Sequence, residues 1–319
     1  MSTYTQKSLT VLISNPTAAE QAIEKRELDY FDTLTNPTDR TINQRQDYKS
    51  PMMLSAHKVK HLNKIPDLKT DAIILNLEDG VSQEMKPFAL RLAMITLSGL
   101  PQSDKKIIVR VNALDEGGKE EIQALNTFKP DAIRIPKIKS VEDVKHVLEL
   151  CDEDIEVHLS IETKEAWLNL KELRVSKRVK AFYLGILDLF ADMGISQELI
   201  TVTNPLIQHI LAEFILTSKA LGVKPISFVF QEYKDESGFQ AWLDLEKQLG
   251  FDAKGCLSPN QVEQVQATFG HDQAALTRAR YIVKIFEKKR EEGVTGFSDE
   301  KYGFIDEPIY KGALALLEG

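Results

Sequence analysis

Residues 157–189, VHLSIETKEAWLNLKELRVSKRVKAFYLGILDL, decide the fold. The stretch holds two short apolar runs, at 157–161 and 181–184, separated by a segment long enough for a helix. Each run is followed at once by polar residues. Short, mostly continuous apolar runs suit strands that are covered on both faces, as in a parallel sheet. This stretch therefore predicts two parallel strands joined by a helix.

The same pattern recurs along most of the chain. Eight apolar runs alternate with helix-length segments, at 51–54, 72–75, 107–111, 132–135, 157–161, 181–184, 225–230 and 255–257. Helix signals fall between them: we expect Ser140, Asn204-Pro205 and Ser258-Pro259 to begin helices, and Gly222 and Gly250 to end them. The pattern predicts an α/β fold, a (β/α)₈ TIM barrel.

The two ends of the chain differ from this middle part. Residues 1–48 are polar and rich in turn residues around a short predicted helix at 18–30, and we expect an extension packed on the barrel or on a neighbouring subunit. The barrel itself is predicted over residues 49–272. Residues 273–319 form a predicted C-terminal helical or lid segment, with a charged helix to 292, a glycine-rich loop over 293–303 and a short final helix.

Composition limits the classes of partner. Forty basic and 48 acidic side chains give a net charge of −8 without a basic tract, which argues against nucleic acid or an anionic membrane as the main partner. Cys151 and Cys256 form no metal motif, and we interpret both as buried free thiols in a reducing compartment. No run is long enough to cross a membrane, and the start MSTYTQKSLTV has no signal-peptide pattern, so we expect a cytoplasmic protein.

Polar residues at the carboxyl ends of the predicted strands are the candidates for chemistry, because active sites of such barrels lie at that face. Glu162 and Asp188 follow adjacent predicted strands. Carboxylate oxygens that leave room for water and substrate suit Mg²⁺. Arg110 follows a third strand, where its planar guanidinium can hold a substrate carboxylate.

The motifs LNLEDG, VRVNA, IPK, IETKEA, LGILDLFADMGI and GFIDEP occur in this order over residues 49–319. In this the chain resembles the citrate lyase β-subunit-like family of the HpcH/HpaI aldolase superfamily. The resemblance implies a (β/α)₈ barrel, usually trimeric, that cleaves or forms a carbon–carbon bond beside a coenzyme A or acyl-carrier-protein thioester. Its small-molecule substrates would be a 2-oxo acid and that thioester, and its cofactor Mg²⁺.

By position, the resemblance implies that Glu162 and Asp188 bind Mg²⁺ and that Arg110 holds the 2-oxo or hydroxy acid. Asp306 would reach the site from the C-terminal region, often that of a neighbouring subunit, as acid or base. Further substrate-binding residues would surround them. We expect Glu78 and Asp79 to orient ligands or waters. Lys137 and Lys49 are also predicted to bind the substrate.

The chain departs from the family pattern at several positions. Asn76 replaces the first acid of the strand-two motif, Ser55-Ala56 replaces proline-glycine, Lys139 replaces an acid, and Ser258 replaces a histidine. The leading hypothesis is a Mg²⁺-dependent lyase acting on a malyl, citramalyl or citryl thioester. The alternatives are a pyruvate-type class II aldolase acting on free oxo acids and a non-catalytic ligand-binding or assembly subunit. Strand two also lacks the histidine of the HpaI-type aldolases, which favours the thioester branch.

Each candidate also has a structural interpretation. Glu162 can complement a helix dipole while Thr163 caps the helix, and Asp188 can be a simple loop residue. Arg110 can serve a structural ion pair. Asp306 can cap the last helix. His158 is predicted to be a satisfied core histidine.

Overall fold

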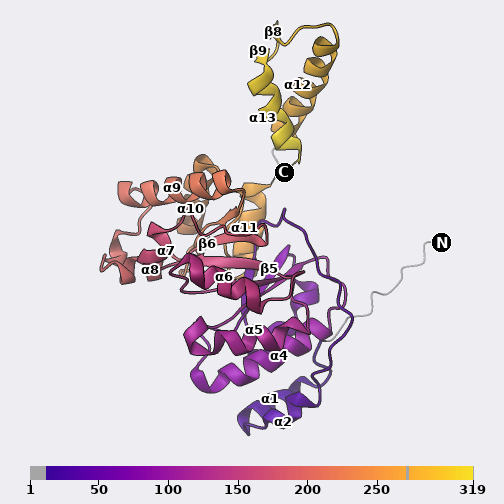
Figure 1. Cartoon of the computed structure of the whole chain (residues 1–319), viewed down its shortest axis with the longest axis vertical. Helices are drawn as coiled ribbons and strands as arrows, with labels where there is room; N and C mark the ends of the chain where they lie inside the picture. Colours follow the sequence, from indigo (N-terminus) through magenta and orange to yellow (C-terminus); the bar gives the residue numbers. More distant parts are fainter. Residues whose placement is uncertain (1–11, 271–272, 319) are drawn as a thin grey trace, which may run out of the picture. The chain divides into compact units, whose positions relative to one another are not determined.

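The computed structural model describes residues 12–270 and 273–318, and the chain divides into two compact units, Met1–Phe269 and Gly270–Gly319 (Figure 1). Each unit is described by itself. The first eleven residues of the predicted extension, including the segment without a signal-peptide pattern, lie outside the described residues.

The first unit is built on a seven-stranded parallel sheet whose strands follow one another in chain order. Six of the eight predicted runs correspond closely to its first six strands. The strands are β1 (Met52–Ser55), β2 (Ala72–Asn76), β3 (Lys106–Arg110), β4 (Ala132–Ile135), β5 (Glu156–Ile161), β6 (Val179–Leu184) and β7 (Lys224–Ile226).

The predicted eighth strand, at 255–257, is not a regular strand. Isolated bridges replace it: Met52 pairs with Cys256, and Ser227 pairs with Lys254. The Cys256 amide donates to the Pro51 carbonyl at 3.0 Å, and the Met53 amide donates to the Cys256 carbonyl at 2.9 Å. This segment therefore joins the two edges of the curled sheet, and the TIM-barrel-like fold predicted from the sequence is confirmed.

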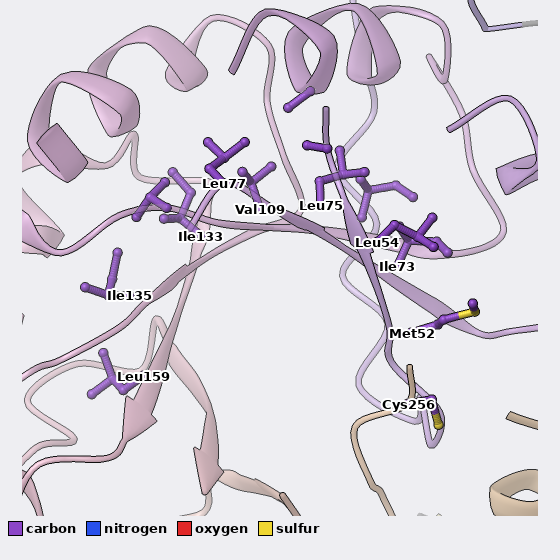
Figure 2. Packing of buried hydrophobic residues seen from close by; sticks show 14 of the residues in the cluster. Met52, Leu54, Ile73, Leu75, Leu77, Val109, Ile133, Ile135, Leu159 and Cys256 are labelled. Carbon is purple, nitrogen blue, oxygen red and sulfur yellow. The ribbon is translucent and has the colours of Figure 1, made fainter. Parts of the chain in front are cut away.

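Alternate residues of each strand face opposite sides of the sheet. The outward-facing set forms one large apolar cluster with the helices, and Figure 2 shows Leu75, Val109 and Ile133 pointing from neighbouring strands to the same side. The inward-facing set, which includes Ile74 and Ile108, forms a separate small cluster inside the barrel. Because inward and outward positions alternate, Asn76, Arg110, Arg134, Ser160 and Glu162 share the inward parity.

Helices cover the outside of the strands (Figure 1). Ser140 caps α6 with its hydroxyl, Asn204 caps α9, and Gly222 and Gly250 adopt positive φ where α9 and α10 end, as predicted. None of the helices in the described part of the chain is long and apolar enough to span a membrane. The helices of this unit are α3 (Val59–Leu62), α4 (Lys86–Ser98), α5 (Lys119–Asn126), α6 (Val141–Leu150), α7 (Lys164–Leu168), α8 (Ile186–Asp192), α9 (Pro205–Leu221), α10 (Glu236–Leu249) and α11 (Pro259–Phe269), with short turns of helix at Ile65–Asp67, Gln83–Met85, Leu114–Gly118 and Gln197–Leu199.

Residues 12–48 pack on the barrel. The single predicted helix at 18–30 is two helices, α1 (Pro16–Glu24) and α2 (Leu28–Asp32), because Arg26 adopts a left-handed φ of 60° between them. Farther along, the buried guanidinium of Arg40 forms an ion pair of 2.7 Å with Asp131, which precedes β4. Residues 40–48 are thereby held at the amino ends of the strands.

The second unit is a small helix-and-hairpin assembly. Helix α12 (Gln273–Glu291) packs beside α13 (Glu307–Glu318) around an apolar cluster that includes Phe286 and Ile305 (Figure 1). The predicted glycine-rich loop at 293–303 is wrong: the segment holds β8 (Gly296–Asp299), which pairs antiparallel with β9 (Gly303–Asp306). Gly303 supplies the positive φ that the hairpin turn requires, so the glycine that suggested a loop belongs to a hairpin.

Candidate active site

A cavity of about 620 Å³ opens at the carboxyl ends of the barrel strands. Parallel strands bring their carboxyl ends to one edge, so residues far apart in sequence meet there. Both apolar and charged groups line the cavity. The lining residues include Asn76, Asp79, Arg110, Arg134, Glu162, Tyr183, Gly185 and Asp188.

Glu162, at the end of β5, is buried and held by backbone. Its Oε1 accepts the Lys137 amide at 2.8 Å, and Lys137 adopts a φ of 53°, unusual for a residue with a side chain. Gly185 packs directly against Glu162: a Cβ there would lie 2.5 Å from the Glu162 Cβ. The cap of α7 is Thr163, whose hydroxyl accepts the Ala166 amide, so Glu162 has no capping role.

Asp188 lies in the first turn of α8 and is exposed to the cavity. Partial desolvation by the cavity walls raises the pKa of its carboxyl, and the carboxylates of Glu162 and Asp79 raise that pKa further. A second hollow, of about 640 Å³, also reaches both Glu162 and Asp188. The two carboxylates therefore stand where the two hollows meet.

Arg110, at the end of β3, is already paired. Its Nη2 lies 2.5 Å from Glu78 Oε2, 3.5 Å from Asp79 Oδ2 and 3.8 Å from Glu162 Oε2. Burial raises the pKa of Glu78 to about 7, although the positive charge of Arg110 opposes that change. The structural ion pair considered for Arg110 is thus present, with its guanidinium still lining the cavity.

Lys137 follows β4, and its Nζ lies 3.7 Å from Glu78 Oε1. Burial lowers the pKa of this lysine, but the carboxylates of Glu78 and Asp79 outweigh it, so the net change is a rise. Glu78 Oε1 has no hydrogen-bond partner among the described residues. The predicted set of Glu78, Asp79, Arg110, Lys137, Glu162 and Asp188 is therefore brought together at one edge of the barrel.

One predicted residue, Lys49, lies apart from this cluster, and another, Asp306, belongs to the second unit. Lys49 precedes β1, at the amino end of the barrel, and its Nζ donates to the Phe269 carbonyl at 3.0 Å; the lysine that lines the cavity is Lys64. Lys49 lies away from the cluster because a residue that precedes a parallel strand lies at the opposite edge of the sheet from a residue that follows one. Asp306 lies in the second unit, where its carboxylate accepts the Ile309 amide at the start of α13.

Sequence reasoning missed Arg134 and Gly185, which both line the cavity. The available signal for Arg134 was a charged residue within an apolar run. His158 is a buried core residue, as expected, and its ring packs near those of Tyr48 and Tyr183. Its Nε2 hydrogen bonds Glu156, but its Nδ1 has no partner among the described residues, so the predicted satisfaction holds for one ring nitrogen only.

The donor set fits a hard divalent cation. Glu162 and Asp188 supply two carboxylates; desolvation, and next the negative charge of Glu162, raises the pKa of Asp188, and a cation bound by both carboxylates would offset their repulsion. Within the described ranges, no group of three or more histidine, cysteine, aspartate or glutamate side chains is placed to hold a metal. Such a site would need water or substrate oxygens to complete it.

The chain belongs to the HpcH/HpaI aldolase/citrate lyase family, whose model matches residues 49–259. Among curated relatives, a (3S)-malyl-CoA thioesterase of Cereibacter sphaeroides is 30% identical over 252 residues, covering 79% of this chain and 87% of the relative. The mitochondrial citramalyl-CoA lyase of Rattus norvegicus is 27% identical over 277 residues, covering 80% of each.

Solved structures share the fold. The CitE protein of Mycobacterium tuberculosis, in complex with magnesium, acetoacetate and coenzyme A, matches with a TM-score of 0.68 at 22% identity, covering 86% of this chain and 98% of that one. The resemblance noted in the sequence is thereby confirmed at the level of family and fold.

Proposed function

We propose that this chain is a Mg²⁺-dependent carbon–carbon lyase that cleaves or forms a short 3-hydroxyacyl thioester of malyl, citramalyl or citryl type. The observation that carries the proposal is the carboxylate pair Glu162 and Asp188 beside the Arg110 guanidinium, at the mouth of a cavity on the catalytic face of the barrel. The names of the relatives, a malyl-CoA thioesterase and a citramalyl-CoA lyase, support the same substrate class.

Each proposed step uses side chains already described. Glu162 and Asp188 would hold Mg²⁺, which, when bound, polarises the hydroxyl or carbonyl oxygen of the substrate and offsets its developing charge. Arg110 orients the carboxylate of the 2-oxo acid, and Glu78 fixes the guanidinium through its 2.5 Å ion pair.

In the cleavage direction, a base takes the hydroxyl proton and the carbon–carbon bond breaks. The bonding electrons pass to the thioester as an enolate, which then receives a proton at carbon. We propose Asp306 as the proton carrier, and the coenzyme A or acyl-carrier thioester as the partner substrate. A homo-oligomer, trimeric by resemblance, would allow the second unit of one subunit to serve the barrel of another.

Hydrolysis of the same thioester is the second candidate, because the relative that is 30% identical is named a thioesterase. If water reached the thioester carbonyl, the same site would hydrolyse the thioester. The two activities differ in products: hydrolysis releases a hydroxy acid and a free thiol, whereas cleavage releases a 2-oxo acid and a shorter thioester.

Calorimetric titration of Mg²⁺ in the presence of pyruvate or glyoxylate tests the proposal. We expect binding in the wild type and its loss in Asp188→Ala, whereas Asp39→Ala, which removes a fully exposed carboxylate, serves as the matched control. Wild-type protein that binds neither Mg²⁺ nor an oxo acid would refute the lyase proposal. Binding without turnover of malyl, citramalyl or citryl thioesters would favour a non-catalytic subunit, and turnover of free oxo acids alone a pyruvate-type aldolase.

A further inference from the structure

Arg134 is a buried guanidinium that lines the cavity, and among the residues that the structure describes it has no carboxylate in an ion pair with it. We propose that Arg134 forms a second anion-binding subsite, which selects a 2-oxo acid bearing a second carboxylate and therefore a thioester substrate with two carboxylates. This inference rests on the proposed function and narrows it. It concerns the part of the substrate that becomes the oxo acid, and not the thioester carrier.

The register of the sheet places Arg134 beside the metal-site candidates. On β4 it is the ladder partner of Arg110 on β3 and of His158 on β5. Its side chain points into the barrel and lines the cavity. Arg110 and Arg134 thus stand next to each other on adjacent strands, and both line the same cavity.

The contacts of Arg134 orient its guanidinium but do not neutralise it. Nε donates to the neutral hydroxyl of Ser160 at 2.9 Å, and the guanidinium carbon lies 4.2 Å from the ring centre of Tyr183. Within the described part of the chain, no carboxylate lies within 4.0 Å of Arg134, and no acceptor bonds its two terminal nitrogens. A fork of N–H donors is left directed at the cavity.

An unpaired buried charge is unfavourable unless a ligand pairs with it. Arg134 is only 6% exposed. Burial, and next the positive charge of Arg110, lowers the pKa of Arg134 to about 10, although the carboxylates of Glu162 and Glu78, neither in an ion pair with it, oppose the change; Arg134 therefore stays charged at neutral pH. A carboxylate of the substrate would satisfy the two free nitrogens in the bidentate geometry that guanidinium favours.

The two arginines are not equivalent, which argues for two anionic groups on the ligand. Arg110 is already held by Glu78, whereas no carboxylate of residues 12–270 or 273–318 pairs with Arg134. A monocarboxylic oxo acid oriented by Arg110 would leave Arg134 unpaired. A dicarboxylic oxo acid pairs with both.

Matched pairs of acids test this inference by calorimetry in excess Mg²⁺: oxaloacetate against 2-oxobutyrate, and 2-oxoglutarate against 2-oxovalerate. Each pair has the same number of carbons and differs in its second carboxylate. The variants are Arg134→Met, which keeps the apolar stem, and Arg134→Lys, which keeps the charge. The melting temperature of each ligand-free variant reports whether Arg134 supports the fold.

We expect the wild type to bind at least one diacid about 10- to 100-fold more tightly than its matched monoacid, as for a charge-assisted hydrogen bond. Arg134→Met should abolish this preference without lowering the melting temperature, and Arg134→Lys should keep part of it. Equal affinity for mono- and diacids in the wild type overturns the subsite but leaves the lyase proposal standing. Equal loss of both acids in Arg134→Met, with a lower melting temperature, overturns it in favour of a structural arginine. Failure of every acid to bind overturns the lyase proposal and this inference with it.

Discussion

The contact between Gly185 and Glu162 predicts that Gly185→Ala disrupts the metal site. Gly185 has a φ of −99°, which alanine adopts freely, so the effect is steric and not a matter of backbone strain. The added Cβ would lie 2.5 Å from the Glu162 Cβ and 2.7 Å from its Oε2, where ordinary contacts are 3.4–4 Å. Glu162 or the chain at Gly185 must therefore move by about 1 Å.

That movement is large on the scale of metal coordination, where ligand distances are held within about 0.2 Å. We expect the affinity for Mg²⁺ to fall about 10- to 100-fold, the range found when groups that orient a ligand are changed. Overpacking should also lower the free energy of unfolding by about 1–3 kcal/mol. Calorimetry gives the first quantity and urea unfolding the second.

Gly312→Ala is the matched control. Gly312 lies within α13, and a Cβ there meets no atom within 4 Å. We expect this variant to bind Mg²⁺ normally and to gain up to about 1 kcal/mol of stability from helix propensity. Glu162 is not a Mg²⁺ ligand if Gly185→Ala is destabilised as expected yet binds Mg²⁺ with an affinity within twofold of the wild type.

Three further predictions concern other contacts. Asp131→Ala leaves the buried Arg40 guanidinium without its carboxylate, so urea unfolding should show a loss of about 3–5 kcal/mol; a loss below about 1 kcal/mol would contradict this. Asp306→Asn keeps an acceptor for the Ile309 amide, so thermal unfolding should be unchanged while turnover falls about 10²- to 10⁴-fold; undiminished turnover would exclude Asp306 as the proton carrier. The pKa of Glu78, about 7 when folded and 4.5 ordinarily, means that the unfolded chain releases this proton first as pH rises. Stability of the metal-free protein should therefore decline by about 3 kcal/mol between pH 4.5 and 7, and Glu78→Gln should remove this decline in urea titrations.

The fold was predictable because its signals are local. Buried parallel strands need continuous apolar runs, and the helix ends carried caps such as Ser140 and glycines such as Gly222. The eighth run was assigned as a strand on the same signal, but residues 253–256 form only isolated bridges to the two edges of the sheet, which a local apolar run does not reveal. In the second unit, the hairpin of β8 and β9 depends on cross-strand pairing that a run of glycine and polar residues does not reveal.

The site was predictable only in part. Strand-end position was enough to gather Arg110, Glu162 and Asp188, because it depends on chain direction alone. The same rule places Lys49, which precedes β1, at the amino edge of the barrel, away from the site. Lys49 was assigned to the site from the family resemblance and not from its position relative to the strand. Whether the charge of Arg134 is paired depends on side chains from neighbouring strands, and whether Gly185 can carry a side chain depends on a contact between two different loops. A local sequence motif therefore predicts neither the pairing of Arg134 nor the close contact at Gly185.

Charge balance ties the separate parts of the site together. Four carboxylates and three cationic side chains form the cluster of close charges at this edge of the barrel, apart from Lys64, which also lines the cavity: Glu78, Asp79, Glu162 and Asp188 against Arg110, Arg134 and Lys137. Fully ionised, the group carries one net negative charge, which disfavours an anionic acid. A divalent cation reverses the sign to one net positive charge. Binding of the cation and binding of the acid are then coupled, and because coupling of binding free energies is reciprocal, the oxo acid must raise the affinity for the cation by the same factor.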